Sequence, residues 1–221
     1  PAFSVQGSTE LFFAGYNQGD ISLSGSIHLK PSNNWGFIAG VESFSQEPVY
    51  QLRKFDSNFG SWDNNSFKKI NLIRVFGTIS LDRIHTDLSI SNQLISNWVF
   101  MGLNANPEQA NSVLNVLRAE VSNKIRVQKW YLYSRILIQQ TNGNSVLSLP
   151  LVQYQESIFR EGKIRKTTPW RIGIDLIGCT SFQANAYQPQ SGLFYLQNQK
   201  KNSEADKHWL ERRCIQSNQC L

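Results

Sequence analysis

The chain has 221 residues, of which 40% are hydrophobic, 17% are charged and 12% are aromatic, and this composition excludes an intrinsically disordered protein. No stretch approaches the roughly 18 consecutive apolar residues that a membrane-spanning helix needs, so the chain is either soluble or a transmembrane β-barrel. The formal net charge is +6, but the basic residues are dispersed and lie in no known binding motif, which argues against a nucleic-acid partner.

Alternation of apolar and polar residues with a period of two is the dominant pattern along the chain. Successive side chains of a strand point to opposite faces, so each such segment predicts a strand with one apolar and one mostly polar face. Most of the predicted strands are near the roughly 9–11 residues that a tilted strand needs to cross a bilayer. There are nine, at residues 9–16, 21–30, 35–44, 70–80, 84–91, 113–121, 130–139, 152–160 and 170–176.

Residues 107–121 admit a second interpretation as a helix. The sequence PEQANSVLNVLRAEV contains good helix formers, and Pro107 suits the first turn of a helix. Against a helix, Asn111 and Ser112 resemble the end of a loop, and the segments on both sides have strand patterns. We favour the strand and keep the helix as the alternative.

The connections between predicted strands alternate in length from the third strand onward. An up-and-down barrel has this alternation when its two rims face different compartments, with short turns on one side and longer loops on the other. A soluble Greek-key sandwich has no reason to produce it. The sequence therefore predicts an all-β protein, an antiparallel up-and-down transmembrane β-barrel.

Charged residues inside the predicted strands are the candidates for lining the lumen of such a barrel. In a barrel, lumen charges set the selectivity of a water-filled channel, whereas in a soluble sandwich they would form the solvent face. Mixed signs favour a weakly selective interior, or charge pairs that partly close it. The candidates are Glu42, Arg74, Asp87, Arg118, Glu120, Arg135, Glu156, Arg160, Arg171 and Asp175.

The sequence has no motif for catalysis. There is no Gly-rich phosphate loop, no HExxH and no GxSxG, and the three cysteines have no metal-ligand spacing. His85 and Asp87 would share one face of a strand, but no nucleophile or third orienting group accompanies them, so we interpret them as a solvated polar pair. We therefore predict no enzyme activity, no catalytic residues, no cofactor and no metal site.

Three segments in the second half of the chain resemble the putative porins of the Bacteroidota. The stretch WYLYSRILIQQTNGNSVLSLP (130–150) is similar to a strand that runs through a loop into a Leu-Pro-Leu-Pro-like sequence, with Ser148 as the departure. WRIGIDLIGCTSF (170–182) resembles the family's QIGVDVRY strand, and AYQPQSGLFYLQNQ (186–199) resembles its loop A-Y-x-P-x-x-G-x-F-Y-x-Q. The resemblance covers roughly residues 8–199.

The resemblance implies a bacterial outer-membrane protein through which small solutes pass by diffusion. Its partners would be outer-membrane lipid and small polar solutes, and the family brings no catalytic residues. The resemblance leaves the oligomeric state open.

The end of the chain departs from this family. Residues 200–221 are polar, charged and without alternation, whereas the family continues with further strands. Nine strands is also an odd number, and an open sheet edge in lipid would leave backbone groups unpaired. We therefore expect residues 1–199 to form part of a larger barrel and residues 200–221 to lie outside its fold.

A secreted, soluble β-domain that binds carbohydrate is the alternative. It would use the aromatic side chains of the long loop between the third and fourth predicted strands. These are Tyr50, Phe55, Phe59 and Trp62.

Overall fold

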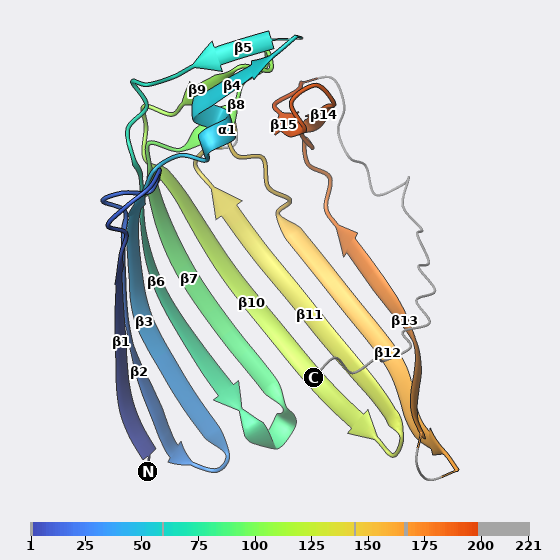
Figure 1. The fold of residues 1–221 in the computed structure, drawn as a ribbon. Coiled ribbons are helices and arrows are strands. Elements are labelled where there is room, and N and C mark those ends of the chain that lie inside the picture. Colours follow the sequence, from blue (N-terminus) through green and yellow to red (C-terminus); the bar gives the residue numbers. More distant parts are fainter. Residues whose placement is uncertain (1, 59, 144, 166–167, 199–221) are drawn as a thin grey trace.

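The computed structural model describes residues 2–58, 60–143, 145–165 and 168–198, and most of them form one antiparallel sheet (Figure 1). The sheet has nine strands in the order β1-β2-β3-β6-β7-β10-β11-β12-β13. The order follows the chain, so each strand pairs with its neighbours in sequence. The strands are β1 (Ala2–Leu11), β2 (Ile21–Ser32), β3 (Trp35–Gln46), β6 (Ile70–Leu81), β7 (Thr86–Ser96), β10 (Leu114–Val127), β11 (Trp130–Thr141), β12 (Val152–Ile164) and β13 (Thr168–Cys179).

This arrangement confirms the predicted all-β class and the up-and-down order of an incomplete barrel. β1 and β13 stand at the two ends of the sheet, which is not closed within the described residues. No helix in the described part of the chain is long and apolar enough to cross a membrane. The predicted tail, residues 200–221, lies outside the described residues.

Each of the nine predicted strands corresponds to one strand of the sheet, but the first was misplaced. β1 ends at Leu11, and residues 12–20 form a turn in which the Phe12 N–H donates to the Asp20 carbonyl at 3.0 Å. Gly15 and Gly19 both have positive φ in this turn, a backbone conformation that glycine adopts without steric cost. The apolar pair at residues 12 and 13 suggested a strand where the chain in fact reverses.

The helical interpretation of residues 107–121 is wrong. Pro107–Gln109 forms the short strand β9, and most of the remainder belongs to β10, which pairs with β7 on one side and β11 on the other. Helix propensity is a weak preference, and two complete strand ladders outweigh it.

The two ends of the sheet differ as the connection lengths predict (Figure 1). Short turns join β2 to β3, β6 to β7, β10 to β11 and β12 to β13 at one end, which we call the turn rim. Longer connections meet at the other end, the loop rim. They carry α1 (Tyr50–Arg53), β4 (Lys54–Ser57), β5 (Gly60–Asp63), β8 (Val99–Met101), β9, β14 (Ala186–Gln188) and β15 (Leu193–Tyr195), while η1 (Asp82–Ile84) lies in a turn at the turn rim.

The sheet has an apolar face and a polar face. Paired residues on neighbouring strands point to the same side, so the register assigns every side chain to one face. One row of the apolar face runs across six strands through Phe37, Ile79, Leu88, Val121, Ile136 and Tyr154. A row of the polar face runs through Thr78, Ser89 and Glu120.

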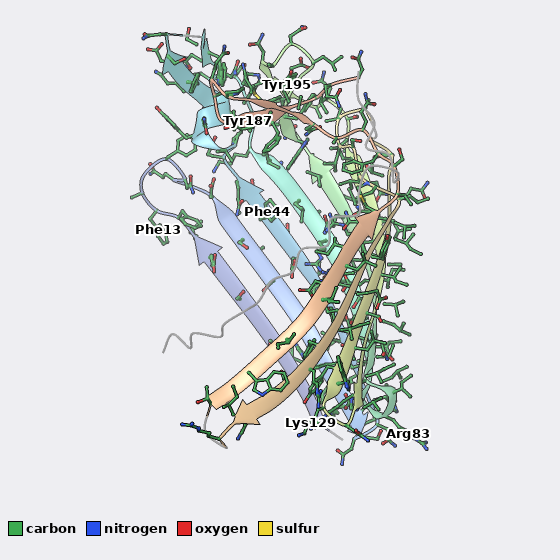
Figure 2. The ribbon with its side chains drawn as sticks, turned by 90° about the vertical axis from the view of Figure 1, so that its right-hand side faces the viewer. Phe13, Phe44, Arg83, Lys129, Tyr187 and Tyr195 are labelled. Carbon is green, nitrogen blue, oxygen red and sulfur yellow. The ribbon has the colours of Figure 1, made fainter. Side chains whose placement is uncertain are left out.

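The apolar face is the more exposed of the two. Ile90 and Ile174 are 58% and 54% exposed, whereas Arg74, Ser89 and other polar-face side chains are partly buried. In the side view of Figure 2, strands from both ends of the sheet lie on the same side of its middle strands, so the sheet is curved. Side chains converge on the inside of a curve and spread on its outside, and the burial therefore puts the polar face inside.

A small apolar core lies at the loop rim. It is built on Ile95, Leu114 and Val116, which share the polar side of the sheet with Arg118. The apolar side chains that pack against these three come from the start of β6 and from loops. They are Ile70, Leu72, Trp98, Val146, Leu147 and Leu149. The inside of the curved sheet is therefore filled at the loop rim and polar below it.

Candidate functional site

The register places eight of the ten candidate lumen residues on the polar face. These are Glu42, Arg74, Asp87, Arg118, Glu120, Arg135, Arg171 and Asp175. The other two, Glu156 and Arg160, point to the apolar face, where they pair with Leu176 and Ile172 of β13. The register thus separates these two residues from the main group.

Glu156 and Arg160 each have a partner on the apolar face. The Ser134 hydroxyl donates to the Glu156 carboxylate at 2.5 Å, and the Arg160 guanidinium lies over the Trp130 ring at 5.6 Å. Such contacts reduce the cost of a charged group among apolar neighbours.

Ion pairs join neighbouring strands across the polar face. Arg74 donates to Glu42 at 3.0 Å. Arg135 binds Glu120 through two parallel hydrogen bonds of 2.8 and 2.7 Å, the geometry in which a guanidinium holds a carboxylate most strongly. The polar face is therefore lined with fixed, largely compensated charges.

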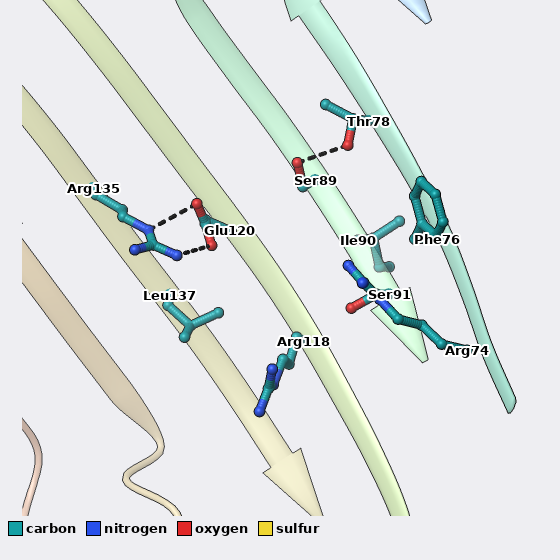
Figure 3. A pocket seen from close by; sticks show the side chains of 10 residues that line it. All are labelled: Arg74, Phe76, Thr78, Ser89, Ile90, Ser91, Arg118, Glu120, Arg135 and Leu137. Carbon is teal, nitrogen blue, oxygen red and sulfur yellow. Dashed lines mark hydrogen bonds and ion pairs between the residues drawn. The ribbon is translucent and has the colours of Figure 1, made fainter. Parts of the chain in front are cut away.

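A pocket of about 260 Å³ opens on the polar face at the middle of the sheet (Figure 3). It spans β6, β7, β10 and β11 and contains three arginines but only one carboxylate. Its lining residues are Arg74, Phe76, Thr78, Ser89, Ile90, Ser91, Arg118, Glu120, Arg135 and Leu137. The pocket thus brings together four of the predicted lumen residues.

Sequence reasoning missed the uncharged members of this pocket. Thr78 and Ser89 are partners on the adjacent strands β6 and β7, and their hydroxyl oxygens are 2.9 Å apart. Ser91 and Phe76 are cross-strand partners on the same face. The sequence did contain a signal for them. Phe76 and Thr78 lie two and four residues after Arg74, and Ser91 lies two residues after Ser89. Residues two apart on a strand share a face, so this spacing predicts that they lie together.

A second polar cluster lies at the loop rim and has a structural role. Asp20 is almost fully buried, and its carboxylate accepts from the Lys69 ammonium and from the Glu47 N–H, both at 2.9 Å. Glu47 in turn pairs with Arg53. These contacts tie the β1–β2 turn to the long loop between β3 and β6.

Tyr16 belongs to the same cluster. Its hydroxyl donates to the Pro48 carbonyl at 2.6 Å. Burial raises the pKa of the Tyr16 hydroxyl above its ordinary value, and the nearby Arg53 guanidinium opposes that shift.

The aromatic residues proposed for carbohydrate binding contact other parts of the protein. Phe55 stacks on Trp62 with ring centroids 4.6 Å apart, and the Trp62 N–H donates to the Gln51 carbonyl at 2.9 Å. Tyr50 meets the Tyr16 ring edge-on at 5.2 Å. Phe59 lies outside the described residues. These rings therefore make ring and hydrogen-bond contacts within the loop rim, while Tyr50 stays 56% exposed.

His85 lies outside the strand that carries Asp87, so the two do not share a strand face as predicted. β7 begins at Thr86, and His85 lies before it in the turn with φ of 49°. Asp87 points to the polar face between Ser80 and Ser122 of the neighbouring strands. In the part of the chain that the structure describes, no group of three or more His, Cys, Asp or Glu could hold a metal ion.

Comparison with known protein families identifies the family of this chain. The family model described as a putative porin matches residues 2–208 of the chain. No curated protein is similar enough to count as a match.

Proposed function

Because the chain belongs to the putative porin family, we propose that its sheet forms part of the wall of an outer-membrane channel through which small polar solutes diffuse. The observation that carries the proposal is the orientation of the two faces. The apolar face is outside and exposed, and the charged face is inside and partly buried. This is the reverse of a soluble protein and the arrangement expected of a barrel in lipid.

The apolar face suits contact with lipid tails. In the described residues no second layer packs on it, and its Val, Ile and Leu side chains remain about half exposed. In water such a large exposed apolar surface would drive association between molecules. In a bilayer the same surface contacts lipid tails, which are as apolar as its own side chains.

The polar face suits a water-filled passage. Its hydroxyl groups and its Glu42–Arg74 and Glu120–Arg135 pairs offer hydrogen bonds to water and to small polar solutes. The eight predicted lumen residues that lie on this face form the lumen-lining set that we propose, without Glu156 and Arg160. Passage of this kind needs no cofactor and no catalytic group.

The two rims suit an asymmetric membrane. Short turns on one side and folded loops on the other are the arrangement of outer-membrane barrels, whose long loops face outward. We therefore propose that the loop rim, with its apolar core and its Asp20–Lys69 pair, faces the outside of the cell.

Fractionation of the outer membrane tests the location. The full-length gene is expressed with its own leader, and outer membranes are washed with alkaline carbonate, which strips peripheral proteins. We expect the protein to remain in the washed membrane pellet. Release into the soluble fraction would contradict the proposal and would favour the secreted carbohydrate-binding alternative.

Planar bilayers test the passage of solutes. The protein extracted from washed membranes is expected to raise the conductance of the bilayer in discrete steps. A membrane-inserted protein without such steps would be a structural barrel rather than a channel.

A further inference from the structure

The arginines of the polar-face pocket differ in their partners. Arg74 pairs with Glu42, and Arg135 pairs with Glu120. Arg118 has no ion pair within the described residues, although its guanidinium lies in the same pocket (Figure 3). With Glu42 counted, the pocket has three positive and two negative groups, so its one uncompensated charge is on Arg118.

Arg118 is also partly withdrawn from water. Its Nε atom is buried and has no hydrogen-bond partner among the described residues. Its cross-strand neighbours are Gln139, which is 4% exposed, and Ser91. A charge near low-polarity walls acts more strongly on a counter-ion than the same charge in bulk water, and Leu137 supplies such a wall.

Neither Asp87 on β7 nor Glu120, two residues along β10, forms an ion pair with Arg118. Asp87 is four residues along β7 from Ser91, the partner of Arg118, which corresponds to about 13 Å at the usual rise of a strand. Glu120 is occupied by its two hydrogen bonds to Arg135, and Figure 3 shows Arg118 apart from that pair.

We propose that Arg118 binds the oxyanion group, carboxylate or phosphate, of a small solute in this pocket. The proposal rests on the proposed function, because the solute reaches the pocket through the lumen. A guanidinium donates two parallel hydrogen bonds to such a group, and the Ser91 hydroxyl lies on the same face to add a third. The volume of about 260 Å³ is enough to hold a small anion such as phosphate.

Conductance with inorganic phosphate as the probe tests the site. Planar bilayers that hold the protein are bathed in potassium chloride, and phosphate is added in steps. Phosphate bound at Arg118 obstructs the passage of chloride, so conductance falls as phosphate is added. The half-effect concentration is the phosphate concentration at which half of this fall has occurred. We expect Arg118→Gln to raise that concentration by about tenfold, as expected for loss of hydrogen bonds between charged groups.

Lys124→Gln is the matched control. Lys124 lies on the same strand and the same face as Arg118, six residues further on, at about 20 Å. At moderate salt this exceeds the screening length, so the control is expected to change the half-effect concentration by less than about twofold. Glu120→Gln frees Arg135 and is expected to lower the concentration several-fold.

The outcomes separate the two proposals. Equal phosphate effects in wild type and Arg118→Gln, or an equal shift in Lys124→Gln, would overturn the site while the channel stands. A wild type that does not conduct would overturn the channel. In that case the site is tested by the broadening of the phosphate NMR signal when detergent-solubilised protein is added. The proposal requires that Arg118→Gln abolish this broadening and that Lys124→Gln retain it.

Discussion

The loop rim and the sheet below it differ in where their apolar side chains lie. At the rim they lie on the inside of the sheet, and below it they lie on the outside. At the rim, Leu114 is 1% exposed on the inside of the sheet, as in a soluble protein. Four residues further along the same strand, Arg118 occupies the inside of the sheet. Val121, on the outside, is 43% exposed. One strand therefore passes from an apolar core to a polar inner face within a few residues.

The difference shows which contacts stabilise each region. The rim buries apolar side chains and the Asp20 carboxylate within the protein itself. The wall gains little by packing within the described residues, and in the proposed function its outer face contacts lipid. Substitutions that act on only one of the two regions can break or sharpen this comparison.

The largest effect is expected from Leu114→Ala. It removes a buried side chain from the rim core and should lower the free energy of unfolding by about 2–5 kcal/mol. Leu117→Ala is the control, because Leu117 lies on the same strand with its side chain 44% exposed on the apolar face. We expect less than about 1 kcal/mol there. Urea unfolding of the detergent-solubilised protein measures both, and equal costs would contradict the comparison.

Charge on the two faces of β10 should have the next largest effect. Val121→Arg puts a cation toward lipid and is expected to cost about 2–4 kcal/mol near the middle of the bilayer. Ser122→Arg puts the same group on the polar face, where it should be tolerated. The yield of each variant in carbonate-washed outer membranes checks the expectation. A wall that faces water on both sides would tolerate both variants.

Loss of the buried carboxylate at the loop rim should have a moderate effect. Asp20→Asn removes the negative charge 2.9 Å from the Lys69 ammonium and leaves only Glu47, at 4.0 Å, to pair with it, so it is expected to cost about 1–3 kcal/mol. Asp82→Asn breaks the exposed Lys30–Asp82 pair of the turn rim and should cost at most about 1 kcal/mol. Thermal unfolding followed by circular dichroism compares them, and a larger shift for Asp82→Asn would contradict the structural role of the rim cluster.

The smallest effect is a dependence on alkaline pH. Burial raises the pKa of Tyr16 in the folded state, so the folded protein holds that proton more tightly than the unfolded chain. Stability from this group is therefore complete below the ordinary tyrosine pKa and is lost as pH rises through the higher folded value. Tyr16→Phe should remove this part of the alkaline loss. An unchanged pH profile in that variant would show that Tyr16 does not contribute.

The sequence predicted the wall better than the rim, for a physical reason. Alternation is imposed on each strand by its two unlike faces, so it is visible in a single segment, as in residues 21–30 and 130–139. The rim depends on contacts between distant loops. Nothing in the residues around Asp20 indicates that Lys69 will lie 2.9 Å away.

The faces of β12 and the partners of the arginines also needed the structure. In β12 both sets of alternate positions contain polar residues, so charge alone could not assign Glu156 or Arg160 to a face. Arg118 and Arg135 look alike in the sequence. Only the register, with Glu120 in reach of Arg135, shows which arginine is paired.

Labelling of single cysteines tests the orientation of the wall most directly. Val121→Cys and Ser122→Cys are made in a protein whose own Cys179, Cys214 and Cys220 are changed to serine, and outer membranes are treated with a charged, membrane-impermeant maleimide. We expect labelling of the residue 122 variant and protection of the residue 121 variant, because a thiol reacts only where water reaches it. Labelling of residue 121 with protection of residue 122 would contradict the account.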